Sequence, residues 1–303
     1  MGIIHNTKIP AIGERCIRAG GFELRIIPVI DVMEGIVVRA IAGRRERYLP
    51  LRSQLTRSAE PFDVARALLD ATGAKELYVA DLDGLMRGEP QPGLRELAER
   101  LGVEVWLDVG LKCSGEWKRT SKTRPIIATE TFEQPIPPPV AKRGDLPPTG
   151  RGRVRLQTTF ATPQPDSSPL PVGGRPTFEQ SENGGWGDWT AVQQRDFFTE
   201  RPIISLDYRD GRLLSHHKLN PGDFPTVIVL DTAAVGLNQG PCTVPQCIEI
   251  RQQYPHLDLI TGGGIRNADD LKQLEDIGVN GVLIASALHD GVTFPPSSGS
   301  HRP

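Results

Sequence analysis

Eight short apolar segments recur along this chain, and their number and spacing constrain the fold more than any other feature. Most are nearly continuous apolar runs, which is typical of parallel strands covered on both faces. Amphipathic stretches lie between several of them, beginning at Pro61, Pro92, Thr190, Thr243 and Asn267. Alternating strands and helices indicate a parallel sheet, and eight strands favour closure into a (β/α)8 TIM barrel over an open doubly wound sheet. The expected strands are RIIPVID (25–31), ELYVADLD (76–83), VEVWLD (103–108), RPIIATE (124–130), RPIISLD (201–207), TVIVLD (226–231), LDLIT (257–261) and GVLIAS (281–286).

One segment interrupts this repeat. Residues 133–187 are dense in proline, glycine, serine and charge, with few apolar residues to bury. This composition predicts a mostly disordered insertion between the fourth and fifth strands, although a proline-rich or basic segment that docks on a protein partner is an alternative. Short or broken stretches after the third, fifth and eighth strands predict that some helices are shortened. The expected organisation is an N-terminal extension (1–24), a first half-barrel (25–132), the insertion (133–187), a second half-barrel (188–290) and a disordered tail (291–303).

Composition argues against several classes of function. A formal net charge of -2 gives no global attraction to nucleic acid or to an anionic membrane. No apolar run approaches the roughly 20 residues of a membrane span, so we expect a cytoplasmic protein.

Metal and cofactor chemistry also find little support in the sequence. The cysteines, at positions 16, 113, 242 and 247, lack the paired spacing of a zinc site, and His216 and His217 are adjacent and not spaced as ligands. The glycine-rich GGGIR segment does not match the nicotinamide-binding GxGxxG pattern after a first strand. We expect no metal and no cofactor.

Three consecutive glycines, Gly262, Gly263 and Gly264, follow the seventh expected strand and precede a helical stretch. Without side chains at these positions, backbone N–H groups can approach an anion, and the helix N-terminus adds partial positive charge. Arg266 follows at once, and the eighth strand ends in the small residues Ala285 and Ser286. In a barrel of this kind the loops after strands seven and eight commonly hold a phosphate. These six residues therefore predict a phosphate site, with a tight turn that binds no ligand as the alternative.

Five segments in register carry a resemblance to a known family: IIPVIDVMEGIVVRA, YVADLDG, IISLDYRDGRLL, LITGGGIRNADDL and GVLIASAL. Together they resemble the phosphoribosylformimino-aminoimidazole carboxamide ribotide isomerase family of histidine biosynthesis and its cyclase sister. The resemblance spans residues 25–130 and 200–290. It implies a small phosphorylated, sugar-like substrate.

The resemblance also implies an aminoaldose-to-aminoketose isomerisation. In that reaction an acid protonates the sugar ring oxygen and a base removes a proton from C2, so one carboxyl group must be protonated and the other ionised. Matching PVID and ISLD to the family motifs makes Asp31 the base and Asp207 the acid, with capping of a loop or pairing with an arginine as the alternative for each. Asp81, Asp83 and Arg39 are expected to contact the substrate; the alternatives are loop capping for the aspartates and a solvated or ion-paired side chain for the arginine.

Several positions depart from the family pattern. The family has a second glycine-rich phosphate turn after strand three, but the chain reads WLDVGLKC there. The negative charge of Asp108 would repel a phosphate, and the positive charge of Lys112 would offset this repulsion only in part. Strand eight has Ala285 in place of a glycine. Further substrate contacts are expected at the ends of strands four and six, at Thr129, Asp231 and Thr232, although Ala128, Leu230 and Val235 replace the usual neighbours.

The segment RAIAGRRERYLPLRS (39–53) makes the chain more similar to uncharacterised relatives of the isomerase. Arg44, Arg45 and Arg47 within it either reach an anionic group at the barrel mouth or form a solvated basic loop. Such relatives occur beside genes for methanopterin-linked one-carbon metabolism, as the resemblance implies. Three hypotheses remain open: a histidine-pathway type of isomerase, a related barrel enzyme that acts on a substrate with one phosphate, and a degenerate barrel that binds a partner without catalysis.

Overall fold

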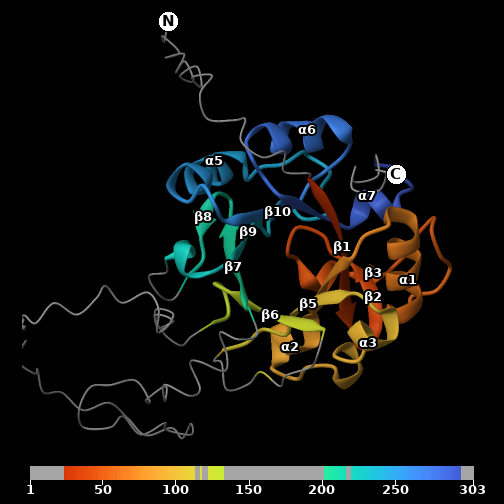
Figure 1. Ribbon diagram of the computed structural model, residues 1–303. Helices are drawn as coiled ribbons and strands as arrows, with labels where there is room; N and C mark the ends of the chain where they lie inside the picture. Colours follow the sequence, from red (N-terminus) through yellow and green to blue (C-terminus); the bar gives the residue numbers. More distant parts are fainter. Residues whose placement is uncertain (1–23, 113–116, 118–121, 133–200, 216–219, 295–303) are drawn as a thin grey trace, which may run out of the picture. The chain divides into compact units, whose positions relative to one another are not determined.

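Eight parallel strands close into a barrel, which confirms the predicted (β/α)8 fold. The computed structural model describes residues 24–112, 117, 122–132, 201–215 and 220–294. Around the ring, β1 is followed by β4, β5, β6, β7, β9, β10 and β11, and β11 pairs with β1 to close it (Figure 1). The barrel strands are β1 (Arg25–Met33), β4 (Glu76–Asp81), β5 (Glu104–Asp108), β6 (Thr123–Ala128), β7 (Ile203–Arg209), β9 (Thr226–Asp231), β10 (Asp258–Gly262) and β11 (Gly281–Ile284).

Two antiparallel hairpins extend the barrel sheet. The first continues β1 into β2 (Ile36–Arg39) and β3 (Leu49–Pro50), with the short 3-10 helix η1 (Arg45–Arg47) between them. The second pairs β7 with β8 (Arg212–Leu213). After β8 the described chain continues through the 3-10 helix η4 (Pro221–Asp223), so no full helix follows the fifth barrel strand in the described residues, as the sequence predicted.

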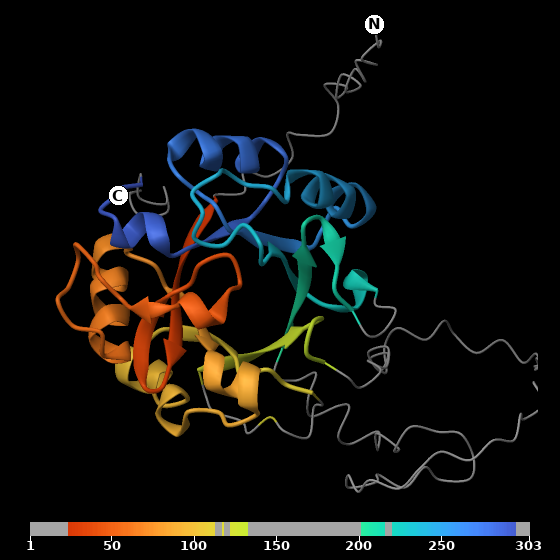
Figure 2. The same ribbon diagram turned by 180° about the vertical axis from the view of Figure 1, so that it is seen from behind.

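Helices α1, α5 and α6 lie on the outside of the ring, and Figure 2 shows the same arrangement from behind. The apolar face of α1 is buried through Val64, Ala65, Leu68 and Leu69, and this helix begins at a proline and ends at Gly73 in a left-handed conformation. The helices are α1 (Pro61–Thr72), α2 (Leu82–Arg87), α3 (Leu97–Leu101), α5 (Val244–Gln253), α6 (Ala268–Asp276) and α7 (Ser286–His289), with the 3-10 helix η2 (Pro92–Leu94) before α3.

Side chains from every barrel strand fill its interior. Trp106 and Ile27 are fully buried there, in contact with branched residues of the neighbouring strands. The barrel is therefore a packed core and not a pore, and its carboxyl-terminal end is left to form a site. The interior cluster comprises Ile27, Val38, Tyr78, Ala80, Leu82, Trp106, Ile126, Ile203, Ile228, Ile260 and Leu283.

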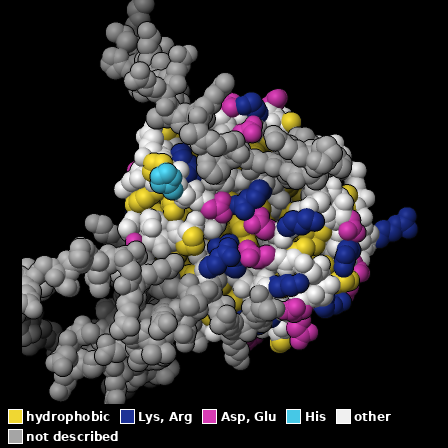
Figure 3. Space-filling view, viewed as in Figure 1, with side chains coloured by type: hydrophobic (Ala, Val, Ile, Leu, Met, Phe, Trp, Pro, Cys, Tyr) yellow, Lys and Arg dark blue, Asp and Glu magenta, His cyan; other side chains and the backbone are white. Residues whose placement is uncertain are grey.

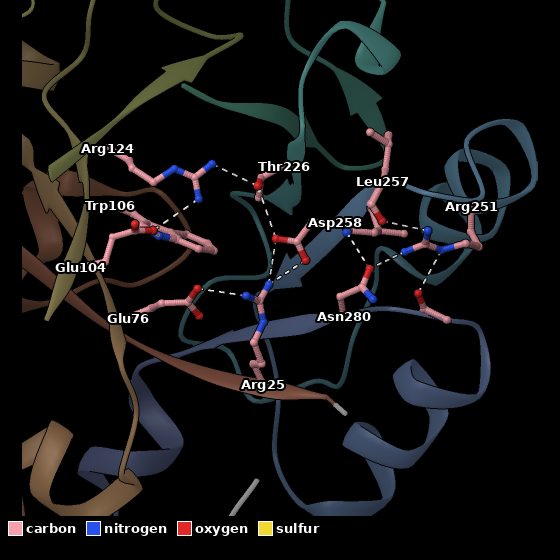
Figure 4. A network of polar contacts seen from close by, with 12 residues as sticks. Arg25, Glu76, Glu104, Trp106, Arg124, Thr226, Arg251, Leu257, Asp258 and Asn280 are labelled. Carbon is pink, nitrogen blue, oxygen red and sulfur yellow. Dashed lines mark hydrogen bonds and ion pairs between the residues drawn. The ribbon is translucent and has the colours of Figure 1, made fainter. Parts of the chain in front are cut away.

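A polar network joins the amino-terminal ends of the strands (Figure 4). Arg25, at the start of β1, donates to Glu76 on β4 at 2.9 Å and to both carboxylate oxygens of Asp258 on β10 at 2.6 and 2.8 Å. Arg124 on β6 donates to Thr226 on β9 at 3.1 Å, and Thr226 in turn donates to Asp258. Because these strands are far apart in sequence, the network holds the ring closed at the end opposite the candidate site. Basic and acidic side chains are also interleaved at the centre of the face shown in Figure 3.

The predicted strands agree with the observed ones within two residues at each end, and two predicted elements also differ in their type of structure. The second predicted strand (76–83) ends at Asp81, because the Asp81 side chain accepts a hydrogen bond from the N–H of Gly84 and caps α2. The helical stretch from Pro92 is divided into η2 and α3. The insertion (133–187), the helical stretch from Thr190, nearly all of the N-terminal extension (1–24) and most of the tail (291–303) lie outside the described residues, so their organisation stays a prediction.

Candidate active site

A pocket that opens to solvent occupies the carboxyl-terminal end of the barrel, and its empty space together with the open solvent at its mouth is about 1050 Å³. Its wall is built from the ends of β1, β4, β5, β7, β9 and β11 and from residues that follow β2, β4, β6, β9, β10 and β11. The loop between β2 and β3 also contributes, because the N–H of Ala42 donates to the carbonyl oxygen of Val235 beyond β9 at 2.7 Å. Active sites of (β/α)8 barrels form at this end.

Asp31 and Asp207 face this pocket from opposite sides of the ring. Asp31 lies on β1 and Asp207 on β7, which are separated by three barrel strands in either direction. Burial raises the pKa of Asp31 to about 7, and the nearby positive charge of Arg45 partly offsets this rise. Burial, followed by the negative charge of Glu130, raises the pKa of Asp207 to about 8. At neutral pH the pocket therefore holds two carboxyl groups that differ in their readiness to ionise.

Neighbouring side chains orient the Asp207 carboxyl group. Ser205 donates to its Oδ1 at 2.7 Å, and Thr129 donates to its Oδ2 at 3.3 Å. The hydroxyl of Thr129 also accepts from the backbone N–H of Asp207 at 2.8 Å. Thr129 does not line the pocket, so it contacts the predicted acid and not the substrate space.

Three further residues line the pocket although their sequence context predicted no role for them: Glu130, Tyr48 and Tyr78. Tyr78 donates to Oδ2 of Asp108 at 3.0 Å, and burial raises the pKa of Asp108 to about 6. Glu130 pairs with Arg45, whose guanidinium lies 3.4 Å from its Oε1. Glu130 follows β6 by two residues, so its position just after a barrel strand was the available signal.

Gly263 and Gly264 line the pocket together with Ala285 and Ser286 after β11. Both glycines have left-handed backbones, with φ of 88° and 77°. Their N–H groups and that of Ser286 are not taken up by hydrogen bonds to other described residues. No charged side chain from β10, β11 or the loops after them lines the pocket among the described residues. The turn can therefore offer backbone donors to an anion.

Two members of the predicted phosphate site lie elsewhere. Gly262 is the last residue of β10 and does not line the pocket; a Cβ there would lie 2.7 Å from the Cβ of Leu283. Arg266 binds Asp270 on α6 with its guanidinium, at 3.0 Å from Nε and at 2.7 Å from the terminal nitrogen. Its side chain is thus occupied by the first turn of α6 and does not line the pocket.

Four predicted substrate contacts bind other protein groups and do not line the pocket. Asp81 accepts from the N–H of Gly84 at 3.1 Å and of Gln91 at 2.6 Å. The Asp83 carboxylate accepts a hydrogen bond from the N–H of Glu34 at 2.7 Å. The Asp231 carboxylate accepts one from the N–H of Gly211 at 2.8 Å. Arg39 forms an ion pair with Asp290 at 2.6 Å. These bonds are those of the loop-capping alternative for Asp81 and Asp83 and of the ion-pair alternative for Arg39, and a contact of these residues with a substrate stays a prediction. Thr232 does line the pocket, and its hydroxyl donates to the carbonyl oxygen of Tyr208 at 3.2 Å.

Of the three arginines in the η1 loop, Arg45 lines the pocket, whereas Arg44 and Arg47 are exposed and do not. Arg209 at the end of β7 is the second pocket arginine. The described residues contain no group of His, Cys, Asp and Glu that could hold a metal ion. Cys242 and Cys247 are free thiols, whereas Cys16, Cys113, His216 and His217 lie outside the described residues. Within the described part of the chain, no helix is long and apolar enough to cross a membrane.

Comparison with known proteins places this barrel in a family. An uncharacterized protein of Methanocaldococcus jannaschii, MJ0703, is 26% identical over 280 residues, which cover 89% of this chain and 95% of the relative. The 1-(5-phosphoribosyl)-5-((5-phosphoribosylamino)methylideneamino)imidazole-4-carboxamide isomerase of Syntrophomonas wolfei is 26% identical over 283 residues, covering 88% of this chain and 93% of the relative. The protein of the same name from Symbiobacterium thermophilum is 27% identical over 281 residues, covering 89% and 93%. The model of the family described as histidine biosynthesis protein matches residues 25–136 and 196–293, and the chain belongs to this histidine biosynthesis family.

Proposed function

We propose that this barrel isomerises a phosphorylated aminoaldose to the corresponding aminoketose, with Asp31 as the base and Asp207 as the acid. The observation that carries the proposal is the pair of carboxyl groups that face one pocket from opposite strands, β1 and β7. The pKa of Asp207, about 8, favours a protonated acid at neutral pH. The pKa of Asp31, about 7, leaves a substantial ionised fraction to act as a base. The isomerase names of the relatives point to the same type of reaction.

The reaction needs only proton transfers. Asp207 donates its proton to the ring oxygen as the bond from that oxygen to C1 breaks, which leaves an iminium group at C1. Asp31 then takes the proton from C2, the electron pair forms the C1–C2 double bond, and the iminium electrons move to nitrogen. Tautomerisation of this enaminol places a proton on C1 and a carbonyl at C2, so no oxidant or reductant is consumed.

A phosphate at the Gly263–Gly264 turn would orient the substrate between the two carboxyl groups. The available N–H groups of Gly263, Gly264 and Ser286 support this assignment, since backbone donors bind phosphate oxygens without the desolvation of a charged side chain. Thr129 and Ser205 hold the Asp207 carboxyl in place, so we assign them positioning roles and not substrate contacts.

The test is turnover of an N-aryl ribosylamine 5-phosphate and of the substrate named for the relatives, followed by ketose formation and by uptake of deuterium from solvent. We expect Asp31→Asn and Asp207→Asn each to lower kcat by about 100-fold or more, the usual effect of losing a general acid or base, with phosphate binding and the circular dichroism spectrum unchanged. Glu46→Gln, which removes an exposed carboxylate from the neighbouring η1 helix, is the matched control. Unchanged turnover in both aspartate variants would refute the mechanism.

The pH profile gives a second readout. Below pH of about 7, Asp31 binds a proton and the base is lost. Above pH of about 8, Asp207 loses its proton and the acid is lost. We therefore expect a bell-shaped dependence of kcat/KM on pH, in which the residual activity of Asp207→Asn lacks the falling limb. A falling limb retained in that variant would contradict the assignment of the acid.

A further inference from the structure

The two ends of the pocket differ in charge and in hydrogen-bonding character. In the ring, β5 lies opposite β10 and β6 lies opposite β11, so the described residues that directly follow β5 and β6 lie across the ring from the Gly263–Gly264 turn. We propose that the substrate carries one phosphate, held at this turn, and that Asp108 and Glu130 select a neutral or cationic hydrogen-bond donor at its far end in place of a second phosphate. The inference rests on the proposed function, and it identifies the substrate class of the same site.

The glycine end presents donors without competing charge. Gly263, Gly264, Ala285 and Ser286 line it, and the described residues of β10, β11 and the loops after them contribute no carboxylate to the pocket wall. A phosphate bound there meets no like charge from these loops.

At the far end the backbone donors that follow β6, and that of Gly110 after β5, are already used. After β6, the N–H of Thr129 donates to Ser205 at 2.9 Å, and that of Glu130 donates to Asp207 at 3.3 Å. The next two N–H groups, of Thr131 and Phe132, both donate to the carbonyl oxygen of Ala128. After β5, the N–H of Gly110 donates to Oδ1 of Asp108 at 3.1 Å. A phosphate would have to break these bonds to obtain the backbone donors that the opposite turn offers freely.

The side chains at this end also oppose a phosphate. Asp108 is the last residue of β5, is 5% exposed, and lines the pocket with Glu130. Arg45 also lines the pocket, and it already pairs with Glu130. Lys112, the next cation along the β5 loop, does not line the pocket. A dianion would therefore meet two carboxylates, and it could bind Arg45 only if this guanidinium left Glu130.

The same groups suit a hydrogen-bond donor. Each oxygen of Asp108 accepts one hydrogen bond, from Gly110 or from Tyr78, and a carboxylate oxygen can accept two. A hydroxyl or an ammonium group could therefore add a bond without displacing an existing one. Charge complementarity favours the ammonium, because an ion pair discriminates between ligands by repelling the wrong sign as well as by attracting the right one.

Three ligands that differ only at one end test the inference: octanediol monophosphate, aminooctyl phosphate and octanediol bisphosphate. Titration calorimetry of the wild-type protein should show that the bisphosphate binds no more than about tenfold tighter than the hydroxyl ligand, a difference of about 1.4 kcal/mol, and that the amine binds at least as tightly as the hydroxyl ligand. A wild-type preference of about a thousandfold for the bisphosphate would overturn the inference.

Variants that remove the charge but keep the shape sharpen the test. In the double variant Asp108→Asn, Glu130→Gln, the affinity for the bisphosphate should rise about tenfold relative to wild type and that for the amine should fall about tenfold. The affinity for the hydroxyl ligand should change by no more than about threefold. Glu46→Gln, outside the pocket wall, should change none of the three affinities. Loss of amine affinity in this control to the same extent as in the double variant would contradict a specific role for Asp108 and Glu130.

The ligand series separates this inference from the proposed function. Equal turnover of wild type, Asp31→Asn and Asp207→Asn would refute the isomerase mechanism without changing the ranking of the three ligands. A strong bisphosphate preference would refute the inference while leaving the two-aspartate mechanism intact. If none of the three ligands binds, the assignment of the phosphate site is refuted, and so is the inference that depends on it.

Discussion

Alanine at Gly263 and at Gly264 should destabilise the protein to different extents, because the two glycines are required for different reasons. Gly263 has φ of 88°, but a Cβ would meet its nearest atom, the carbonyl oxygen of Asp231, at an ordinary distance of 3.5 Å. Gly264 has φ of 77°, and a Cβ there would lie 2.4 Å from the carbonyl oxygen of Gly240. The N–H of Gly240 also donates to the carbonyl oxygen of Gly264 at 2.9 Å, so these two segments are in direct contact.

The magnitudes follow from these contacts. A left-handed backbone costs a residue with a Cβ about 1–2 kcal/mol, which is the whole expected effect of Gly263→Ala. Gly264→Ala adds overpacking of about 1–3 kcal/mol. Moving the Gly240 segment away would also weaken the hydrogen bond, at about 1 kcal/mol. We therefore expect Gly264→Ala to cost about 3–6 kcal/mol in total, at least twice the cost of Gly263→Ala.

Urea denaturation followed by circular dichroism measures both free energies of unfolding. Gly73→Ala is the matched control, because Gly73 has φ of 68° and no atom within 4 Å of an added Cβ. It should cost about as much as Gly263→Ala, about 1–2 kcal/mol, through backbone strain alone. The reasoning is refuted if Gly264→Ala costs no more than Gly73→Ala. Calorimetry with octanediol monophosphate adds the functional readout: Gly263→Ala should weaken binding, whereas Gly73→Ala should leave it unchanged.

Two further predictions concern charge. The pKa of Asp207 is raised from 3.8 to about 8, so the folded state retains the proton and stability is lost as the pH rises between these values. Because asparagine does not ionise, Asp207→Asn should lose less stability than wild type over this interval in urea titrations at several pH values, and an identical loss in both proteins would contradict the raised pKa. At the other end of the barrel, Arg25→Met leaves Glu76 and Asp258 without their shared partner and should lower the free energy of unfolding by about 1–3 kcal/mol, since the pairs are partly exposed. Lys272→Met, which breaks an exposed ion pair on α6, is the control and should change the free energy of unfolding by no more than about 0.5 kcal/mol. Equal effects of the two variants would show that the Arg25 network adds no more stability than an ordinary surface ion pair.

The strands and the ends of the strands could be predicted from the sequence, because both depend on local patterns. Apolar runs such as TVIVLD specify a strand that is buried on both faces, whatever follows in the chain. The aspartates that end these runs, Asp31 and Asp207, were therefore expected at the carboxyl-terminal end of a barrel, where both face the pocket. The glycine turn after LDLIT was likewise placed at that end, since its position follows from the order of the strands.

The partner of each polar side chain was decided only by the tertiary structure. Arg39 pairs with Asp290, which is 251 residues away, and Asp231 caps a hairpin turn through Gly211, 20 residues before it. Arg266 lies next to the glycine turn in sequence but binds Asp270, one helical turn further along. Glu130, in contrast, received no role from its local sequence, yet the closed ring brings it to Arg45 and into the pocket. A hydrophobic pattern can be interpreted within one strand, because burial depends on the periodicity of that strand. The role of a carboxylate or guanidinium depends instead on the donors, acceptors and charges that the folded chain places within a few ångströms of it.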